Sequence, residues 1–319
     1  MLPTEVSRNT CQPIPLTDGE CFPVIDVPNE AAEDVEEKGT TIKFWLQGKQ
    51  LLYKQAREGT GEHWSEKITS ELAAEIGLPA AYVELAKWRG NYGVVTASVL
   101  QPGEELVEAK DLLARLTLSG EPNPRLHTLE NNFALLDRIN QPLRWNPPPE
   151  IKRTRDTFIG YLVFDAWVNN EDRHHENWGV IDIQPWARED DFSRYFLAAS
   201  FDHASSLGRE QTDEQRKVLL TTNQVGDYIA RCLSGIFPDE TAADPLSAHA
   251  AVERAFELEP EATRFWIGRV LALSDKKIEN LFNRLPQDAI SPFARALALA
   301  VLQYSAERFS RLLKIGIQK

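Results

Sequence analysis

The apolar residues of this chain change their spacing near residues 101–103, and that change limits the folds it can adopt. Between residues 41 and 100, segments with strand-like alternation flank one helical segment. Beyond residue 103, apolar residues recur mostly at helical spacing. Gln101, Pro102 and Gly103 separate the two regions and have the composition of a hinge. The pattern predicts an α+β protein with a small β-rich N-lobe and a large, mostly α-helical C-lobe.

The N-lobe is predicted to hold two β-hairpins and one helix. "TIKFWL" and "QLLYKQA" flank a glycine-containing turn at 47–49, and "YVELAKW" and "YGVVTASVL" flank a second turn at 89–91. Between the hairpins, an apolar residue recurs at every fourth position: Trp64, Ile68, Leu72 and Ile76. Gly77 follows, where a helix usually ends. We predict an N-lobe over 39–103 and a C-lobe over 104–319. Residues 1–38, Pro-rich and then acidic, are expected to form an extended or partly ordered lead-in.

Composition excludes several classes of protein. The 319 residues carry a net charge of −13, which argues against nucleic-acid binding through clustered Lys and Arg. Three scattered cysteines indicate a reducing compartment rather than a disulfide framework. The N-terminus lacks the pattern of a secretory signal, and the longest clean apolar run near the C-terminus, 296–302, is too short to span a membrane. We therefore expect a cytoplasmic protein with neither a nucleic-acid nor a membrane partner.

One loop concentrates ionisable side chains between two buried segments. The apolar helical run "TRDTFIGYLVFDAWV" stops at Asn169 and Asn170, and polar residues fill the chain from Asp172 to Asn177. Two strand-like pieces follow, "WGVIDI" and "YFLAASF", and they bracket a polar insert at 184–194. The layout is a helix, a charged loop and a hairpin that ends just before Asp202.

Phosphoryl transfer from ATP requires these residue types in this order. It needs a Lys on the phosphates, a carboxylate that takes the acceptor proton, and an Asn and an Asp that bind magnesium. Asp172 and Asn177 are five residues apart on one loop, and Asp202 follows across the predicted hairpin. Lys54 stands on an N-lobe strand before the single helix. Because the four residues occur in the required order on the expected elements, the sequence predicts a magnesium- and ATP-dependent kinase.

The same residues resemble a known family. "NNEDRHHEN" resembles the catalytic loop of HipA-like serine/threonine kinases, N-x-D-R-H-x-x-N, and "SFDHASSLG" resembles their metal-binding segment. "GEHWSEKITSELAAEIGLPAA" resembles the N-lobe helix of the smaller HipA-like proteins. The resemblance covers about residues 39–208. It implies a bilobal protein-kinase-like fold, use of ATP and Mg²⁺, and phosphorylation of a Ser or Thr hydroxyl of a protein substrate.

The resemblance also implies roles for single residues. Asp172 would be the catalytic base, Asn177 and Asp202 the metal ligands, and Lys54 the phosphate anchor. Glu66 would pair with Lys54, with Glu62 and Glu71 as rivals. The remaining predicted nucleotide-binding residues are Gln101 at the hinge and, in place of a Gly-rich phosphate loop, the weak substitutes Gly39 and Thr40 in "EKGTTIKF".

The chain also departs from the family pattern. Asp202, His203 and Ala204 replace the DFG motif of protein kinases. Longer relatives meet a DNA-binding antitoxin through an extra N-terminal segment without a counterpart here. From the resemblance alone, an antitoxin protein is still a candidate partner, and a toxin–antitoxin role is still a candidate role.

Other readings stay open at this point. Asp172 and Asn177 are common at turns and helix caps, and a strand lysine such as Lys54 is often simply solvated. Arg173 is expected to form a structural ion pair. Alternative functions are a phosphoinositide or small-molecule kinase of the same fold, and a nucleotide-binding module without turnover. A further alternative is a metallohydrolase whose ligands would be Asp172, His174, His175, Asp202 and His203.

Overall fold

The computed structural model describes residues 19–30, 35–36, 42–46, 50–115, 120–186 and 191–315. The chain forms two compact units, each assembled from separate stretches of sequence. The first comprises residues 1–98, 202–225 and 273–301, and the second comprises 99–201, 226–272 and 302–319. A sheet-rich N-terminal part and a mostly helical remainder confirm the predicted α+β class. Gly39, Thr40 and the turn at 47–49 lie outside the described residues.

The first unit is built on a sheet of six strands in the order β1-β5-β6-β4-β3-β2. The strands are β1 (Val24–Val27), β2 (Val35–Glu36), β3 (Lys43–Leu46), β4 (Leu51–Gln55), β5 (Val83–Trp88) and β6 (Asn91–Ala97). Both predicted hairpins are present, since β3 pairs antiparallel with β4 and β5 antiparallel with β6. The second turn uses Arg89 and Gly90, both with positive φ, as tight hairpin turns require.

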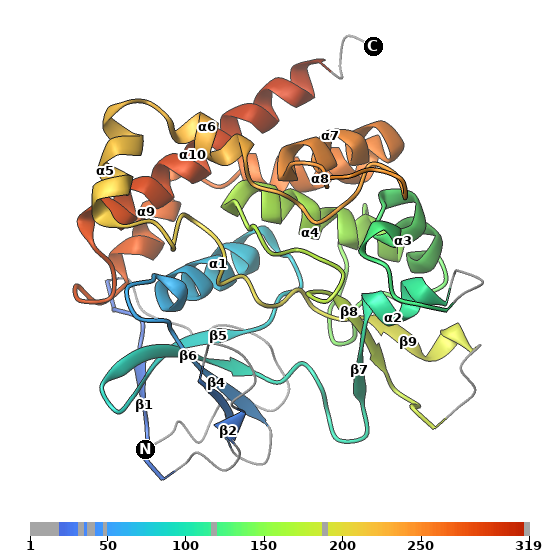
Figure 1. Ribbon diagram of the computed structural model, residues 1–319, viewed down its shortest axis with the longest axis horizontal. Coiled ribbons are helices and arrows are strands. Elements are labelled where there is room, and N and C mark those ends of the chain that lie inside the picture. The colour runs from blue at the N-terminus through green and yellow to red at the C-terminus, as the bar shows by residue number, and fades with distance from the viewer. Residues whose placement is uncertain are drawn as a thin grey trace. The chain divides into compact units, whose positions relative to one another are not determined.

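Strand alternation in β4 determines which way Lys54 points. Tyr53 is buried in an aromatic cluster with Phe44 and Trp88. The ring centroids of Phe44 and Tyr53 lie 4.9 Å apart, and those of Phe44 and Trp88 lie 5.0 Å apart. Because successive strand residues point to opposite faces, Lys54 projects from the other face of the sheet. Helix α1 (Glu62–Ile76) packs against β5 and β6 and supplies the partner of Lys54 described below (Figure 1).

Helix α1 begins and ends as the sequence predicts. Trp64, Ile68, Leu72 and Ile76 are all buried. Gly77 takes the left-handed conformation, with φ of 76°, and its N–H donates to the carbonyls of Ala73 and Ala74. Such a glycine satisfies the unpaired carbonyls at the end of a helix. The helices α5 (Asp213–Thr221) and α9 (Asp275–Asn283) also belong to this unit.

The lead-in contributes two strands that the sequence did not predict, the two-residue β2 and the longer β1. Residues 24–27 pair in parallel with 85–88 of β5, and their side chains alternate between buried and more exposed positions. Only four residues long and flanked by Pro23 and Pro28, this strand carries too little pattern to be recognised locally.

The second unit centres on helix α4 (Thr154–Val168), which contacts α7 (Ala248–Leu258) and α8 (Pro260–Leu271) (Figure 1). Nearly every α4 side chain is buried, and Asn169 ends the helix in the left-handed conformation. A three-stranded sheet, β7-β8-β9, combines the predicted hairpin β8 (Gly179–Asp182) and β9 (Tyr195–Leu197) with β7 (Glu105–Glu108), which was not predicted.

The remaining helices complete the two units. The second unit also holds α2 (Ala109–Ala114), α3 (Leu129–Leu136) and the short 3₁₀ helices at Pro124–Leu126 and Phe192–Arg194. Two helices belong partly to each unit, α6 (Val225–Ala230) and α10 (Pro292–Ile315). In the described part of the chain, no helix has the length and apolar character needed to cross a membrane.

The lowered pKa of a buried histidine predicts how the stability of the folded protein depends on pH. Burial lowers the pKa of His249 to about 3, and Arg308 lowers it further. A histidine that is neutral when folded contributes stability above its unfolded pKa of about 6.5, and this stability is lost as the pH falls toward the folded value. At pH 5 the loss is about 2 kcal/mol per buried histidine. We expect His249→Leu to remove about that much of the stability difference between pH 7.5 and pH 5 in urea unfolding. An unchanged difference would contradict this.

Candidate active site

Lys54 lies between two carboxylates of the first unit. Its Nζ atom is 3.0 Å from Oε1 of Glu66 and 3.0 Å from Oδ1 of Asp202. The Glu66 side chain is 4% exposed, whereas that of Asp202 is 42% exposed. The buried carboxylate can therefore orient the lysine, while the other faces solvent and is accessible to a ligand.

The rival glutamates of α1 are engaged elsewhere. Glu62 accepts from Arg57 and Arg209, and Glu71 accepts from Lys67. The predicted pairing of Lys54 with Glu66 is thus present. It follows from the geometry of α1, in which Glu66 lies between the apolar positions 64 and 68 and points to the face of β4 that carries Lys54.

The two carboxylates determine the charge of this cluster. Burial would lower the pKa of Lys54, but the negative charges of Asp202 and Glu66 outweigh it and raise the pKa above the ordinary lysine range. Burial raises the pKa of Glu66, and Lys54 partly counteracts the increase. Lys54 is consequently a permanent cation, as a phosphate anchor must be.

Asp202 has an unusual backbone. Its φ is 59°, in the left-handed region that residues other than glycine adopt in only a few per cent of cases, with Asn, Asp and His the most frequent among them. The segment after it is tied to α1, because Ser65 donates to the Ser206 carbonyl and Arg209 pairs with Glu62. A strained residue held by its surroundings is a common feature of functional sites.

Arg173 holds the charged loop of the second unit through the structural ion pair that the sequence predicts for it. Arg173 is 1% exposed and donates from Nε to Asp165 at 2.7 Å and from Nη2 to Ser200 at 2.8 Å. Its Nη1 donates to the Asn177 carbonyl at 2.6 Å. The sequence did not identify Asp165 and Ser200 as anchors; the one signal was Asp165, a lone acid in the apolar run 158–168.

Asp172 and Asn177 lie at the two ends of this loop. The Nδ2 of Asn177 donates to the Asp172 carbonyl at 2.7 Å, and the Asp172 N–H donates to Oδ1 of Asn170. These contacts use the backbone of Asp172, whose side chain is 45% exposed. Since its Nδ2 is engaged with the loop, the amide of Asn177 presents Oδ1 as its remaining ligand atom.

Two histidines of the loop differ in their surroundings. His174 Nε2 is 3.2 Å from Asp172 Oδ1, and this hydrogen bond raises the pKa of His174 although burial opposes it. Burial lowers the pKa of His175. His174 therefore supports the loop beside Asp172.

The other predicted residues contribute less to these clusters. Gln101 is exposed, and its backbone N–H donates to Glu104. These observations do not connect its side chain to Lys54 or to the loop that carries Asp172. Across the residues that the structure describes, no three His, Cys, Asp or Glu side chains are grouped so that they could hold a metal ion. The metallohydrolase reading consequently has no support. Magnesium needs fewer protein ligands, because it commonly binds one or two carboxylates together with substrate phosphates.

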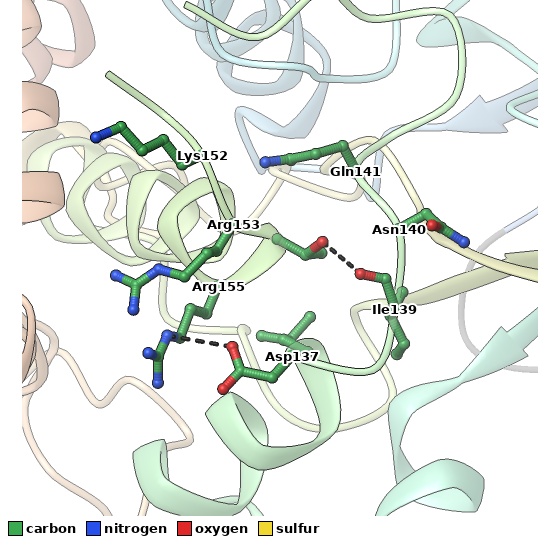
Figure 2. A pocket seen from close by; sticks show the side chains of 9 residues that line it. Asp137, Ile139, Asn140, Gln141, Lys152, Arg153 and Arg155 are labelled. Carbon is green, nitrogen blue, oxygen red and sulfur yellow. Dashed lines mark hydrogen bonds and ion pairs between the residues drawn. The ribbon is translucent and has the colours of Figure 1, made fainter. Parts of the chain in front are cut away.

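A pocket of about 480 Å³ lies in the second unit, at the start of α4. It is lined by Leu136, Asp137, Ile139, Asn140, Gln141, Lys152, Arg153, Thr154 and Arg155. Figure 2 shows Arg155 turned toward Asp137. The Arg155 Nε lies 3.2 Å from Oδ1 of Asp137, and Arg153 pairs with Asp156 and Glu259. Its arginines are thus already neutralised, and none of the predicted site residues lines it. We assign it no part in phosphoryl transfer.

Known structures share this fold. The crystal structure of the Helicobacter pylori proinflammatory kinase CtkA matches with a TM-score of 0.65 and 17% identity, covering 92% of this chain and 100% of that one. HipA of the Shewanella oneidensis toxin–antitoxin system, in complex with HipB and operator DNA, matches with a TM-score of 0.56 and 12% identity. That match covers 90% of this chain and 68% of HipA. The chain has a HipA-like kinase fold. At these sequence identities, the similarity to the two kinases concerns the fold alone. Neither a family model nor a curated protein matches the sequence.

Proposed function

We propose that this protein is a HipA-like kinase that transfers the γ-phosphate of ATP to a Ser or Thr hydroxyl of a protein. The observation that carries the proposal is the position of Lys54, 3.0 Å from both the buried Glu66 and the more exposed Asp202. A lysine oriented by one acid beside a second, accessible acid is the arrangement that protein kinases use at the phosphates. The HipA-like fold supports the same conclusion.

The proposed roles follow from the chemistry of each side chain. Lys54 would hold the phosphates, because its pKa keeps it protonated at any physiological pH. Asp172 would take the proton of the acceptor hydroxyl; its carboxylate is accessible, and its backbone is fixed by Asn170 and Asn177. A positioned base of this kind is effective because the loop that carries it cannot move freely.

Magnesium is chemically suited to each of the two proposed ligands, Asp202 and Asn177. Asp202 has a second carboxylate oxygen besides the one that accepts from Lys54, and Asn177 presents an amide oxygen. Hard oxygen ligands of this type are those that Mg²⁺ prefers. When bound, the ion would neutralise the charge on the β- and γ-phosphates.

A protein partner is also proposed. The HipA neighbour is in complex with HipB and operator DNA. An antitoxin-like protein is therefore a candidate partner for this chain, while direct contact with nucleic acid is not expected of a chain with a net charge of −13. We further propose a cytoplasmic location, on the sequence grounds given above.

Transfer of labelled phosphate tests the proposal. The purified protein should transfer γ-phosphate from MgATP to itself or to a protein in a cell lysate, and EDTA should abolish transfer. Asp202→Asn should lower the rate at least about 100-fold, because asparagine tolerates the left-handed backbone but removes the charge that binds the metal. Asp26→Asn, an exposed site on β1, should leave the rate unchanged.

Three outcomes would contradict parts of this proposal. Label recovered only in lipids or small metabolites would replace the protein acceptor. MgATP binding in a calorimeter with no transfer to any acceptor would indicate a nucleotide-binding module without turnover. Full activity of Asp202→Asn would remove Asp202 from the metal site.

A further inference from the structure

The segment 233–237 of the second unit lies directly against the charged loop. Gly235 has a φ of +69°, and a Cβ atom added there would lie 2.6 Å from the Arg173 carbonyl oxygen and 2.9 Å from the His174 Cα. Both neighbours are backbone atoms, so no side-chain rotation could relieve the overlap. This close contact between the segment and the loop therefore requires glycine at position 235.

The segment is itself fixed on both sides of Gly235. The Ser234 N–H donates to the Leu246 carbonyl at 2.9 Å, and the Phe237 N–H donates to the His127 carbonyl at 2.9 Å. The Gly235 carbonyl accepts a hydrogen bond from Nδ1 of His127 at 2.8 Å. A segment held at three successive points is a firm support rather than a flexible connection.

His127 links this segment to the end of the loop. It is fully buried, and its Nε2 accepts a hydrogen bond from Trp178 Nε1 at 2.9 Å. Trp178 follows Asn177 in the chain and packs on Phe158 of α4, with ring centroids 4.6 Å apart. Burial lowers the pKa of His127 to about 3, so the ring stays neutral, with Nδ1–H as donor and Nε2 as acceptor.

The loop is thus supported from two directions within one unit. The side chain of Asp165 holds Arg173 from α4, and the backbone of Gly235 contacts Arg173 and His174 at the same point of the loop. Asp172 is the residue immediately before that point. Displacing the loop by the size of a methyl group would shift Asp172, and misplacing a catalytic group by about 1 Å can cost about 100-fold in rate.

We propose that Gly235 and His127 are positioning residues for phosphoryl transfer, forming a brace that fixes the loop that carries Asp172 and Asn177. This inference rests on the proposed function, because it names residues that act through Asp172. It predicts a larger effect on the chemical step than on nucleotide affinity, because Gly235 contacts the loop next to Asp172 and neither brace residue is among those assigned to the phosphates.

Gly235→Ala tests the brace, with Gly90→Ala as the matched control. Gly90 also has a positive φ, of +82°, but an added Cβ there meets nothing within 4 Å. Both variants bear similar backbone strain, and only Gly235→Ala collides with the loop. We expect kcat to fall roughly 10- to 100-fold in Gly235→Ala with a much smaller change in KM for ATP, and both constants to stay near wild type in Gly90→Ala.

His127→Phe supplies an independent variant that keeps a ring and deletes both hydrogen bonds. Hydrogen exchange of peptides covering 169–178 reports on the loop without any activity. We expect faster exchange at the Asp172 and Asn177 amides in His127→Phe and Gly235→Ala than in Gly90→Ala. Should one variant fail to fold, the other decides.

The outcomes separate the brace from the proposed function. If exchange and kcat in the folded brace variants match those of Gly90→Ala, the brace is wrong. If the wild type transfers no phosphate but loop exchange still rises in the brace variants, the support of the loop stands and the kinase proposal fails. A rise in KM for ATP with unchanged kcat would overturn the positioning role.

Discussion

Asp172→Asn is expected to lower kcat for phosphate transfer by about 10²- to 10⁴-fold, the usual contribution of a general base. An asparagine cannot accept the proton of the acceptor hydroxyl. The fold should tolerate the change, because the backbone of Asp172 makes hydrogen bonds with Asn170 and Asn177 that asparagine would keep. Among the residues that the structure describes, its side chain lies at hydrogen-bond distance from His174 alone. KM for ATP should stay near wild type, since the proposed phosphate contacts belong to Lys54.

Glu171→Gln is the control for that variant. Glu171 is an exposed acid one residue away on the same loop, so its replacement removes the same charge without touching the proposed base. Steady-state transfer to a protein acceptor should be near wild type in Glu171→Gln and nearly absent in Asp172→Asn. Equal rates in the two variants would remove Asp172 as the base and leave positioning and metal binding as the source of catalysis.

Those features that depend on short-range pattern could be predicted from the sequence. The alternation of β4 identified Lys54 as a strand lysine, and the four-residue spacing from Trp64 to Ile76 identified α1. The left-handed ends at Gly77 and Asn169 were predictable because glycine and asparagine favour that conformation. Local preference and the final fold agree at these positions, as expected of natural sequences.

Features that depend on distant contacts could not be predicted in this way. Strand β1 is defined by parallel pairing with β5, far along the chain, and its four residues carry little pattern of their own. Gly235 lies in the short segment "CLSGIFP", which carries no periodic pattern; only its contact with Arg173 and His174 reveals a constraint. Glu66 was one of three candidate partners for Lys54 among the glutamates of α1, and the direction of its side chain required the structure.

The residue after Glu66 shows how α1 is held against the sheet. Lys67 is 1% exposed and donates to Glu71 at 2.6 Å and to the Val83 carbonyl at 3.0 Å, while its Nζ lies 2.9 Å from Glu84 of β5. It also lies over the ring of Phe22, 4.5 Å from the centroid. The charge network thus ties the helix to β5 and to the segment before β1.

Lys67→Ala is therefore expected to lower the free energy of unfolding by about 3–5 kcal/mol, because it leaves the buried carboxylates of Glu71 and Glu84 without a counterion. Burial already raises the pKa of Glu84 while Lys67 is present. Arg254→Ala, which removes an exposed cation paired with Glu130 and Glu257, should cost less than about 1 kcal/mol. The triple variant Lys67→Met, Glu71→Gln and Glu84→Gln should recover most of the loss, since no buried charge then remains unpaired. Urea unfolding measures all three variants. A similar loss in Lys67→Ala and Arg254→Ala would show that the buried network does not hold α1 in place, and the orientation of Glu66 would then need another cause.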